Sequence, residues 1–103
     1  MAVGQLTTVA RADDVPPGTA CVVRAGEREL ALFNVDGRFH ATQNECLHLG
    51  GPLGHGALDG CIVSCPWHGW QYDVRTGENE FDRALALETF DVVLEDGDVK
   101  VAV

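Results

Sequence analysis

The chain has 103 residues, of which 46% are apolar, and it carries 16 acidic and 7 basic side chains for a net charge of −9. This length suits one domain with its own core, so we expect a single domain over residues 1–103. The negative charge disfavours nucleic acid as a partner, because phosphates would repel it. No apolar run approaches the roughly 20 residues that span a bilayer, so we expect no membrane partner either.

The N-terminal residues contain no basic region followed by an apolar stretch, so they predict no signal peptide. We therefore expect a cytoplasmic protein, in which thiols stay reduced. In that setting, with histidines close by in the sequence, metal binding is favoured over disulfides for the four cysteines. These are Cys21, Cys46, Cys61 and Cys65.

Short strands separated by turns follow one another along the chain. The expected strands are residues 6–9, 19–23, 29–35, 38–42, 61–64, 70–74, 85–94 and 99–103. Hairpin turns are predicted at Asp36-Gly37, Asp59-Gly60 and Asp96-Gly97, because Asp and Gly tolerate the positive φ that these turns require. No segment is typical of a helix. The pattern predicts an all-β fold of antiparallel sheets, either a sandwich or a small barrel.

Two pairs of metal-ligating residues dominate the middle of the chain. Cys46 and His48 are one residue apart, and after a gap of sixteen residues come Cys65 and His68, two residues apart. Two thiolates and two imidazoles suit a [2Fe–2S] cluster, with both cysteines on one iron and both histidines on the other. Two thiolates leave the oxidised core neutral, and adding an electron then costs less than with four.

The segments CLHLGG (46–51) and CPWHGWQYDVRTG (65–77) resemble the two cluster-binding motifs of the Rieske family. The resemblance implies a Rieske-like fold, in which a small cluster-binding lobe, about residues 41–74, is inserted in a β base. It also implies one [2Fe–2S] cluster per chain, held by Cys46, His48, Cys65 and His68.

Four neighbouring residues indicate the low-potential, dioxygenase-type branch of this family. Gly51 and Trp67 stand where respiratory members carry a disulfide, and Trp70 replaces a serine that donates to a cluster sulfide. Tyr72 stands where the family often has a tyrosine bonded to a ligating sulfur. Fewer donors to the sulfurs lower the potential, which we expect at roughly −150 to 0 mV.

This branch implies an electron-transfer component rather than an enzyme. We expect a monomeric ferredoxin that takes electrons from an NAD(P)H-dependent flavin reductase and passes them to a terminal aromatic-ring oxygenase. Two alternatives stay open: a small Rieske subunit of an NAD(P)H nitrite reductase, and a structural zinc module. Residues 41–72 contain only two acidic residues and no Lys or Arg, so Leu49 and Trp67 are candidates for an uncharged docking tip.

Overall fold

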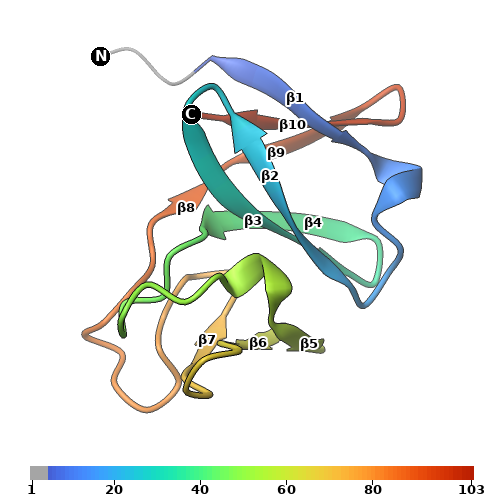
Figure 1. Ribbon diagram of the computed structural model, residues 1–103. Helices are drawn as coiled ribbons and strands as arrows, with labels where there is room; N and C mark the ends of the chain where they lie inside the picture. The colour runs from blue at the N-terminus through green and yellow to red at the C-terminus, as the bar shows by residue number, and fades with distance from the viewer. Residues whose placement is uncertain (1–4) are drawn as a thin grey trace.

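The computed structural model describes residues 5–103, which form three antiparallel sheets. The first has the order β1-β10-β9, with β1 at Leu6–Arg11, β9 at Val92–Glu95 and β10 at Asp98–Ala102. The second has the order β2-β3-β4-β8, with β2 at Ala20–Ala25, β3 at Arg28–Val35, β4 at Arg38–Gln43 and β8 at Thr89–Phe90. The third has the order β5-β6-β7, with β5 at Ala57–Asp59, β6 at Ile62–Ser64 and β7 at Gln71–Asp73. In Figure 1 the four-stranded sheet lies between the other two.

Two of the predicted hairpin turns adopt the expected backbone. Asp36 and Gly37 have φ of 52° and 92°, and they connect β3 to β4 with Val35 paired to Arg38. Asp96 and Gly97 do the same between β9 and β10, with φ of 53° and 81°. Positive φ at both central residues matches the right-handed twist of the flanking strands, which is why these turn sequences set the register.

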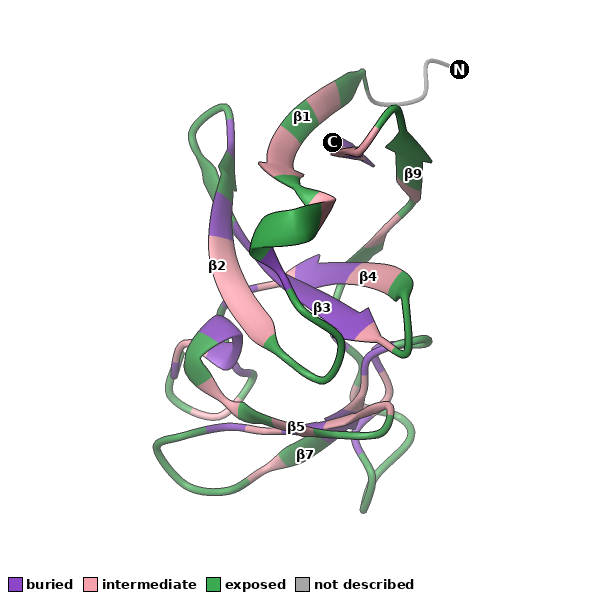
Figure 2. Cartoon of the chain, turned by 90° about the vertical axis from the view of Figure 1, so that its right-hand side faces the viewer, coloured by how far each residue is buried: buried purple, intermediate pink, exposed green. Residues whose placement is uncertain are grey.

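Strand β3 connects two hydrophobic cores. Leu30 and Leu32 pack in the core shared with Val99 and Val101 of the first sheet. The alternate residues of β3, Ala31 and Phe33, pack in a second core with buried side chains of the third sheet and its loops. Successive side chains of a strand point to opposite faces, so this run is buried on both sides, as the purple middle of β3 in Figure 2 shows.

The all-β prediction is confirmed, with two differences in detail. The single strand expected over residues 85–94 is wrong, because the chain changes sheets inside it. Phe90 pairs with Ala41 in the second sheet, while Val92 pairs with Val101 in the first. A strand that leaves one sheet for another must bend, and the apolar pattern does not reveal that bend. Strand β5 and two short 3-10 turns, at Ala12–Asp14 and Leu53–His55, were also not predicted.

The segment between β4 and β8 carries the third sheet and both motif loops, although β4 and β8 are neighbours in the second sheet. The limits of the lobe expected over about residues 41–74 stay a prediction. Within residues 5–103, no helix has the length and apolar character needed to cross a membrane.

Candidate metal centre

The first motif loop, residues 46–51, is closed by two backbone hydrogen bonds at its cysteine. The N–H of Cys46 donates to the carbonyl of Gly51 at 2.9 Å, and the N–H of Gly50 donates to the carbonyl of Cys46 at 3.0 Å. Gly50 has φ of 74°, a left-handed conformation that glycine adopts without strain. The loop therefore turns back on itself and presents the side chains of Cys46 and His48.

The second motif loop, residues 65–70, repeats this arrangement. The N–H of Cys65 donates to the carbonyl of Trp70 at 2.8 Å, and the N–H of Gly69 donates to the carbonyl of Cys65 at 2.9 Å. Gly69 also has a left-handed φ, of 77°. The loop joins β6 to β7, whose pairing fixes both of its ends. The same backbone frame thus holds both cysteines, although the histidine follows at a different spacing in each loop.

The side chains of the two loops meet like with like. Cys46 and Cys65 are both 3% exposed. Burial is the main cause that raises the pKa of Cys46, and the neighbouring Cys65 thiol adds to it. The rings of His48 and His68 lie with their centroids 4.7 Å apart. His68 is exposed and His48 is half-buried, so the thiols lie inside and the imidazoles lie toward the surface.

These residues fit the ligand set of a two-iron cluster. The Nδ1 atom of His48 is buried and has no hydrogen-bond partner, although buried polar atoms are nearly always paired. A metal ion bound to Nδ1 would supply the missing partner. Within residues 5–103, the His, Cys, Asp and Glu side chains form no group of three or more placed to hold one metal ion. Pairs are what two separate irons require.

Tyr72 packs against the first cysteine. Its hydroxyl lies 3.2 Å from the Cys46 Sγ and accepts a hydrogen bond of 3.2 Å from the N–H of Leu47. Burial raises the pKa of Tyr72, and the nearby Cys46 adds to this, whereas the Leu47 N–H and the Asn79 side chain lower it. The role expected for Tyr72, a hydroxyl bonded to a cysteine sulfur, agrees with this geometry.

Gly51 and Trp67 lie against each other, as the resemblance implies for the positions of the respiratory disulfide. A Cβ atom added to Gly51 would lie 2.6 Å from the Cys65 Sγ and 3.1 Å from carbons of the Trp67 ring. Position 51, where the first loop meets the second, therefore has room only for glycine.

Aromatic side chains lie on one side of His48. The ring of Trp70 stacks on His48 with centroids 4.6 Å apart and an interplanar angle of 8°, and Phe81 contacts Trp70 edge-on at 5.1 Å. Four exposed apolar side chains, which we call the apolar rim, occur on the two loops and at this aromatic contact. They are Leu47, Leu49, Trp67 and Phe81, exposed by 42%, 69%, 56% and 68%. The sequence analysis missed Phe81, whose only signal is an isolated aromatic residue in the acidic stretch 78–82.

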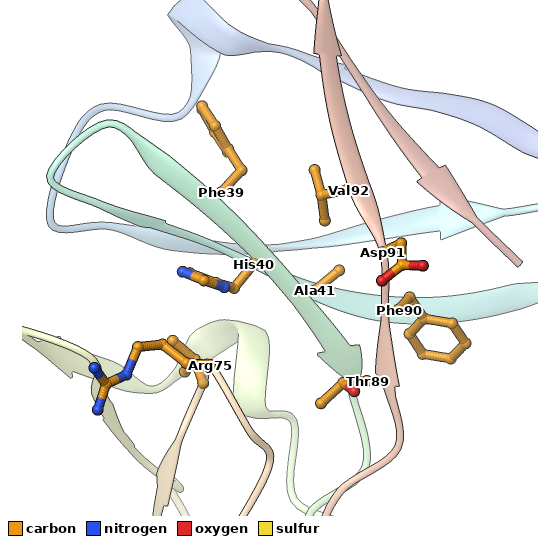
Figure 3. A pocket seen from close by; sticks show the side chains of 9 residues that line it. Phe39, His40, Ala41, Arg75, Thr89, Phe90, Asp91 and Val92 are labelled. Carbon is orange, nitrogen blue, oxygen red and sulfur yellow. The ribbon is translucent and has the colours of Figure 1, made fainter.

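The remaining histidines and cysteines lie elsewhere. His55 is exposed, and Cys21 and Cys61 are free and half-buried. His40 lies on β4 and lines a pocket of about 280 Å³ between β4, β8 and Arg75. Figure 3 shows His40 and Arg75 on one side of this pocket and Asp91 on the other. None of the four motif residues lines it, so the pocket is not part of the candidate metal centre.

Comparison with known proteins gives the family. Residues 5–91 match the "Rieske [2Fe-2S] domain" family. The chain is 38% identical to ferredoxin CarAc of Metapseudomonas resinovorans, over 91% of this chain and 90% of that protein. It is 44% identical to the biphenyl dioxygenase ferredoxin subunit of Pseudomonas sp. (strain KKS102), over 70% and 67% of the two chains.

Solved structures agree. A chain in the complex of reduced oxygenase and oxidized ferredoxin in carbazole 1,9a-dioxygenase has a TM-score of 0.85 and 36% identity, covering 94% of this chain and 92% of that one. A putative NADPH nitrite reductase small subunit has a TM-score of 0.82 at 21% identity, covering 96% and 99% of the two chains, which shows a shared fold alone. The chain belongs to the Rieske [2Fe-2S] domain family.

Proposed function

We propose that this chain is a ferredoxin that carries one electron at a time to a terminal aromatic-ring oxygenase. In this proposal Cys46 and Cys65 hold one iron of a [2Fe–2S] cluster, and His48 and His68 hold the other. The observation that carries it is the sorting of the side chains: buried thiols paired inside, and imidazoles paired at the surface with the buried Nδ1 of His48 left without a partner.

The bound cluster supplies a site that gains and loses one electron. The chain's own residues determine how water and a partner reach that site. Burial of Cys46 and Cys65 keeps water from the sulfurs, while exposure of His68 leaves the imidazole side open to a partner. The apolar rim around that side offers a surface that loses little hydration energy when it is covered.

Charge supports a protein partner with a basic surface. Within residues 5–103, five basic side chains form ion pairs with five acids, and the other acidic side chains of this part of the chain form no ion pair with Lys or Arg. Two exposed acids, Glu80 and Asp82, flank Phe81 of the apolar rim. Long-range attraction between unlike charges speeds encounter, and the apolar contact then holds the complex.

The relatives support the choice of partner, since they are named as ferredoxin components of dioxygenases. An NAD(P)H-dependent flavin reductase as the electron donor rests on the family resemblance. A cytoplasmic location and a monomeric state stay predictions. The nitrite reductase alternative predicts a chain that purifies only with a large partner, whereas a ferredoxin purifies alone and coloured.

Electron paramagnetic resonance of the reduced protein tests the proposal, because mixed His and Cys ligation differs from four-thiolate ligation in its signal. We expect each of Cys46→Ser, Cys65→Ser, His48→Ala and His68→Ala to lose that signal. Two matched controls, Cys61→Ser and His55→Ala, should keep it, because their side chains lie outside the centre. A colourless wild-type protein that contains zinc, or a midpoint above about +150 mV, would overturn the proposal.

A further inference from the structure

Asn79 lies next to Tyr72 in the interior of the protein. Both side chains are fully buried, and the two residues form an isolated antiparallel bridge. The backbone hydrogen bonds that flank the bridge run from the N–H of Asp73 to the carbonyl of Glu78 (2.9 Å) and from the N–H of Glu80 to the carbonyl of Gln71 (2.8 Å). This makes Tyr72 and Asn79 a non-hydrogen-bonded pair, in which side chains on one face lie closest together.

The orientation of the Asn79 amide follows from its oxygen. Oδ1 accepts hydrogen bonds of 3.0 Å from the backbone N–H of Phe81 and of 3.0 Å from that of Asp82. Only the oxygen can accept, so the amide group is fixed with Nδ2 on its other side. Nδ2 is buried and has no hydrogen-bond partner, which is costly for a donor.

The Tyr72 hydroxyl has room for one more donor. Its oxygen has two lone pairs and one proton. The N–H of Leu47 uses one lone pair, and a proton donated to the Cys46 Sγ leaves the second lone pair free. The bridge places the Asn79 side chain beside Tyr72, and within residues 5–103 no hydrogen bond joins Nδ2 to the hydroxyl.

We infer that Asn79 is a positioning residue for the cluster: when the cluster is bound, its Nδ2 donates to the Tyr72 hydroxyl and so directs the hydroxyl proton to the Cys46 sulfur. An oxygen that accepts from both Leu47 and Asn79 has only its proton left to offer, and Sγ is the remaining neighbour. Donation to a ligating sulfur stabilises the reduced cluster and raises the potential. This inference rests on the proposed function, since it requires a cluster bound to Cys46.

A double-mutant cycle on the cluster-loaded protein tests it. Asn79→Ser keeps a short oxygen that can accept from the following N–H groups, as serine does in turns, but it does not carry the amide donor. Tyr72→Phe removes the hydroxyl. The midpoint potential is measured for wild type, each single variant and the pair, with electron paramagnetic resonance to establish that each sample holds the cluster.

We expect Tyr72→Phe to lower the equilibrium constant for reduction about tenfold, or about 59 mV for one electron. Asn79→Ser should lower it about threefold, or about 28 mV, in the wild-type background, and should leave it unchanged in the Tyr72→Phe background. A purely structural role in the turn of residues 79–82 would give the same shift in both backgrounds, and that result would overturn the inference.

A second variant is tested in case the Asn79→Ser protein does not assemble the cluster. Asn79→Ala removes both the acceptor and the donor, and the effect of the lost acceptor on the turn of residues 79–82 occurs in both backgrounds and cancels in the cycle. Coupling to Tyr72→Phe supports the inference, and additivity contradicts it. A wild-type protein without a Rieske signal would instead refute the proposed function, so the two failures are distinguishable.

Discussion

Replacing Gly51 by alanine should remove the cluster and leave the fold. The added Cβ would lie 2.6 Å from the Cys65 Sγ, whereas non-bonded carbon atoms prefer about 3.5–4.0 Å. The sulfur or the loop must therefore move by about 1 Å. Metal–ligand distances are held to about 0.2 Å, so a displaced Cys65 cannot keep its place as a ligand. Overpacking costs about 1–3 kcal/mol, which is less than the total stability of about 5–15 kcal/mol of a typical domain.

Gly50→Ala is the matched control. A Cβ at Gly50 meets no atom within 4 Å, but the residue has φ of 74°, where alanine costs about 1 kcal/mol. Iron and sulfide per chain, the paramagnetic signal and thermal unfolding are measured for both variants. We expect Gly51→Ala to be folded with little iron, and Gly50→Ala to be slightly less stable with full iron. A Gly51→Ala protein with full iron and an unchanged signal would refute the assignment of Cys65 as a ligand at this contact.

Three further predictions concern the surface, the pH dependence and the core. Trp67→Ala and Phe81→Ala should each slow electron transfer to the oxygenase about fivefold to tenfold, or about 1.0–1.4 kcal/mol. Leu94 is also apolar and 53% exposed, but it lies on β9, so Leu94→Ala should leave the rate unchanged. Equal rates for all three variants would exclude docking at the apolar rim. Burial lowers the pKa of His40, so the stability that depends on its neutral form is present above about pH 6.5 and is lost as the pH falls toward the folded-state pKa. His40→Gln should therefore make the denaturation midpoint depend less on pH between about pH 7 and 5. An unchanged slope of the midpoint against pH would contradict this. Phe33→Ala, at a fully buried side chain of β3, should lower the free energy of unfolding by about 3–5 kcal/mol in urea titrations, and a loss below about 1 kcal/mol would mean that the core closes over the cavity.

The sequence predicts most of the candidate site because ligand spacing is a local property. Cys46 and His48 are close together in any fold, and so are Cys65 and His68. The turn at Asp36-Gly37 is equally local, since its conformation depends on two residues. What the spacing alone does not give is that the two loops share one hydrogen-bond frame and meet with like side chains together.

Contacts between distant segments account for what the sequence analysis missed. Asn79 lies in a polar stretch that reads as a surface loop, but pairing with Tyr72 buries it completely. Phe81 belongs to the candidate site because its ring contacts that of Trp70 edge-on, eleven positions away in the sequence. The chain changes sheets at Asp91 because β4 pairs with the residues before it and β10 with the residues after it. The sequence of residues 85–94 alone carries no information about these two partner strands.

The hydrogen bonds to the two cysteines explain why a low potential is expected. Two hydrogen-bonding groups lie near the Cys46 sulfur: the N–H of His48, which donates at 3.4 Å, and the hydroxyl of Tyr72 at 3.2 Å. Within residues 5–103, Cys65 Sγ accepts no comparable hydrogen bond, and Trp70 stands where the respiratory members carry a donating serine. Because each donor to sulfur favours the reduced state, a proton donated by the Tyr72 hydroxyl raises the potential, which therefore depends on whatever fixes the direction of that proton.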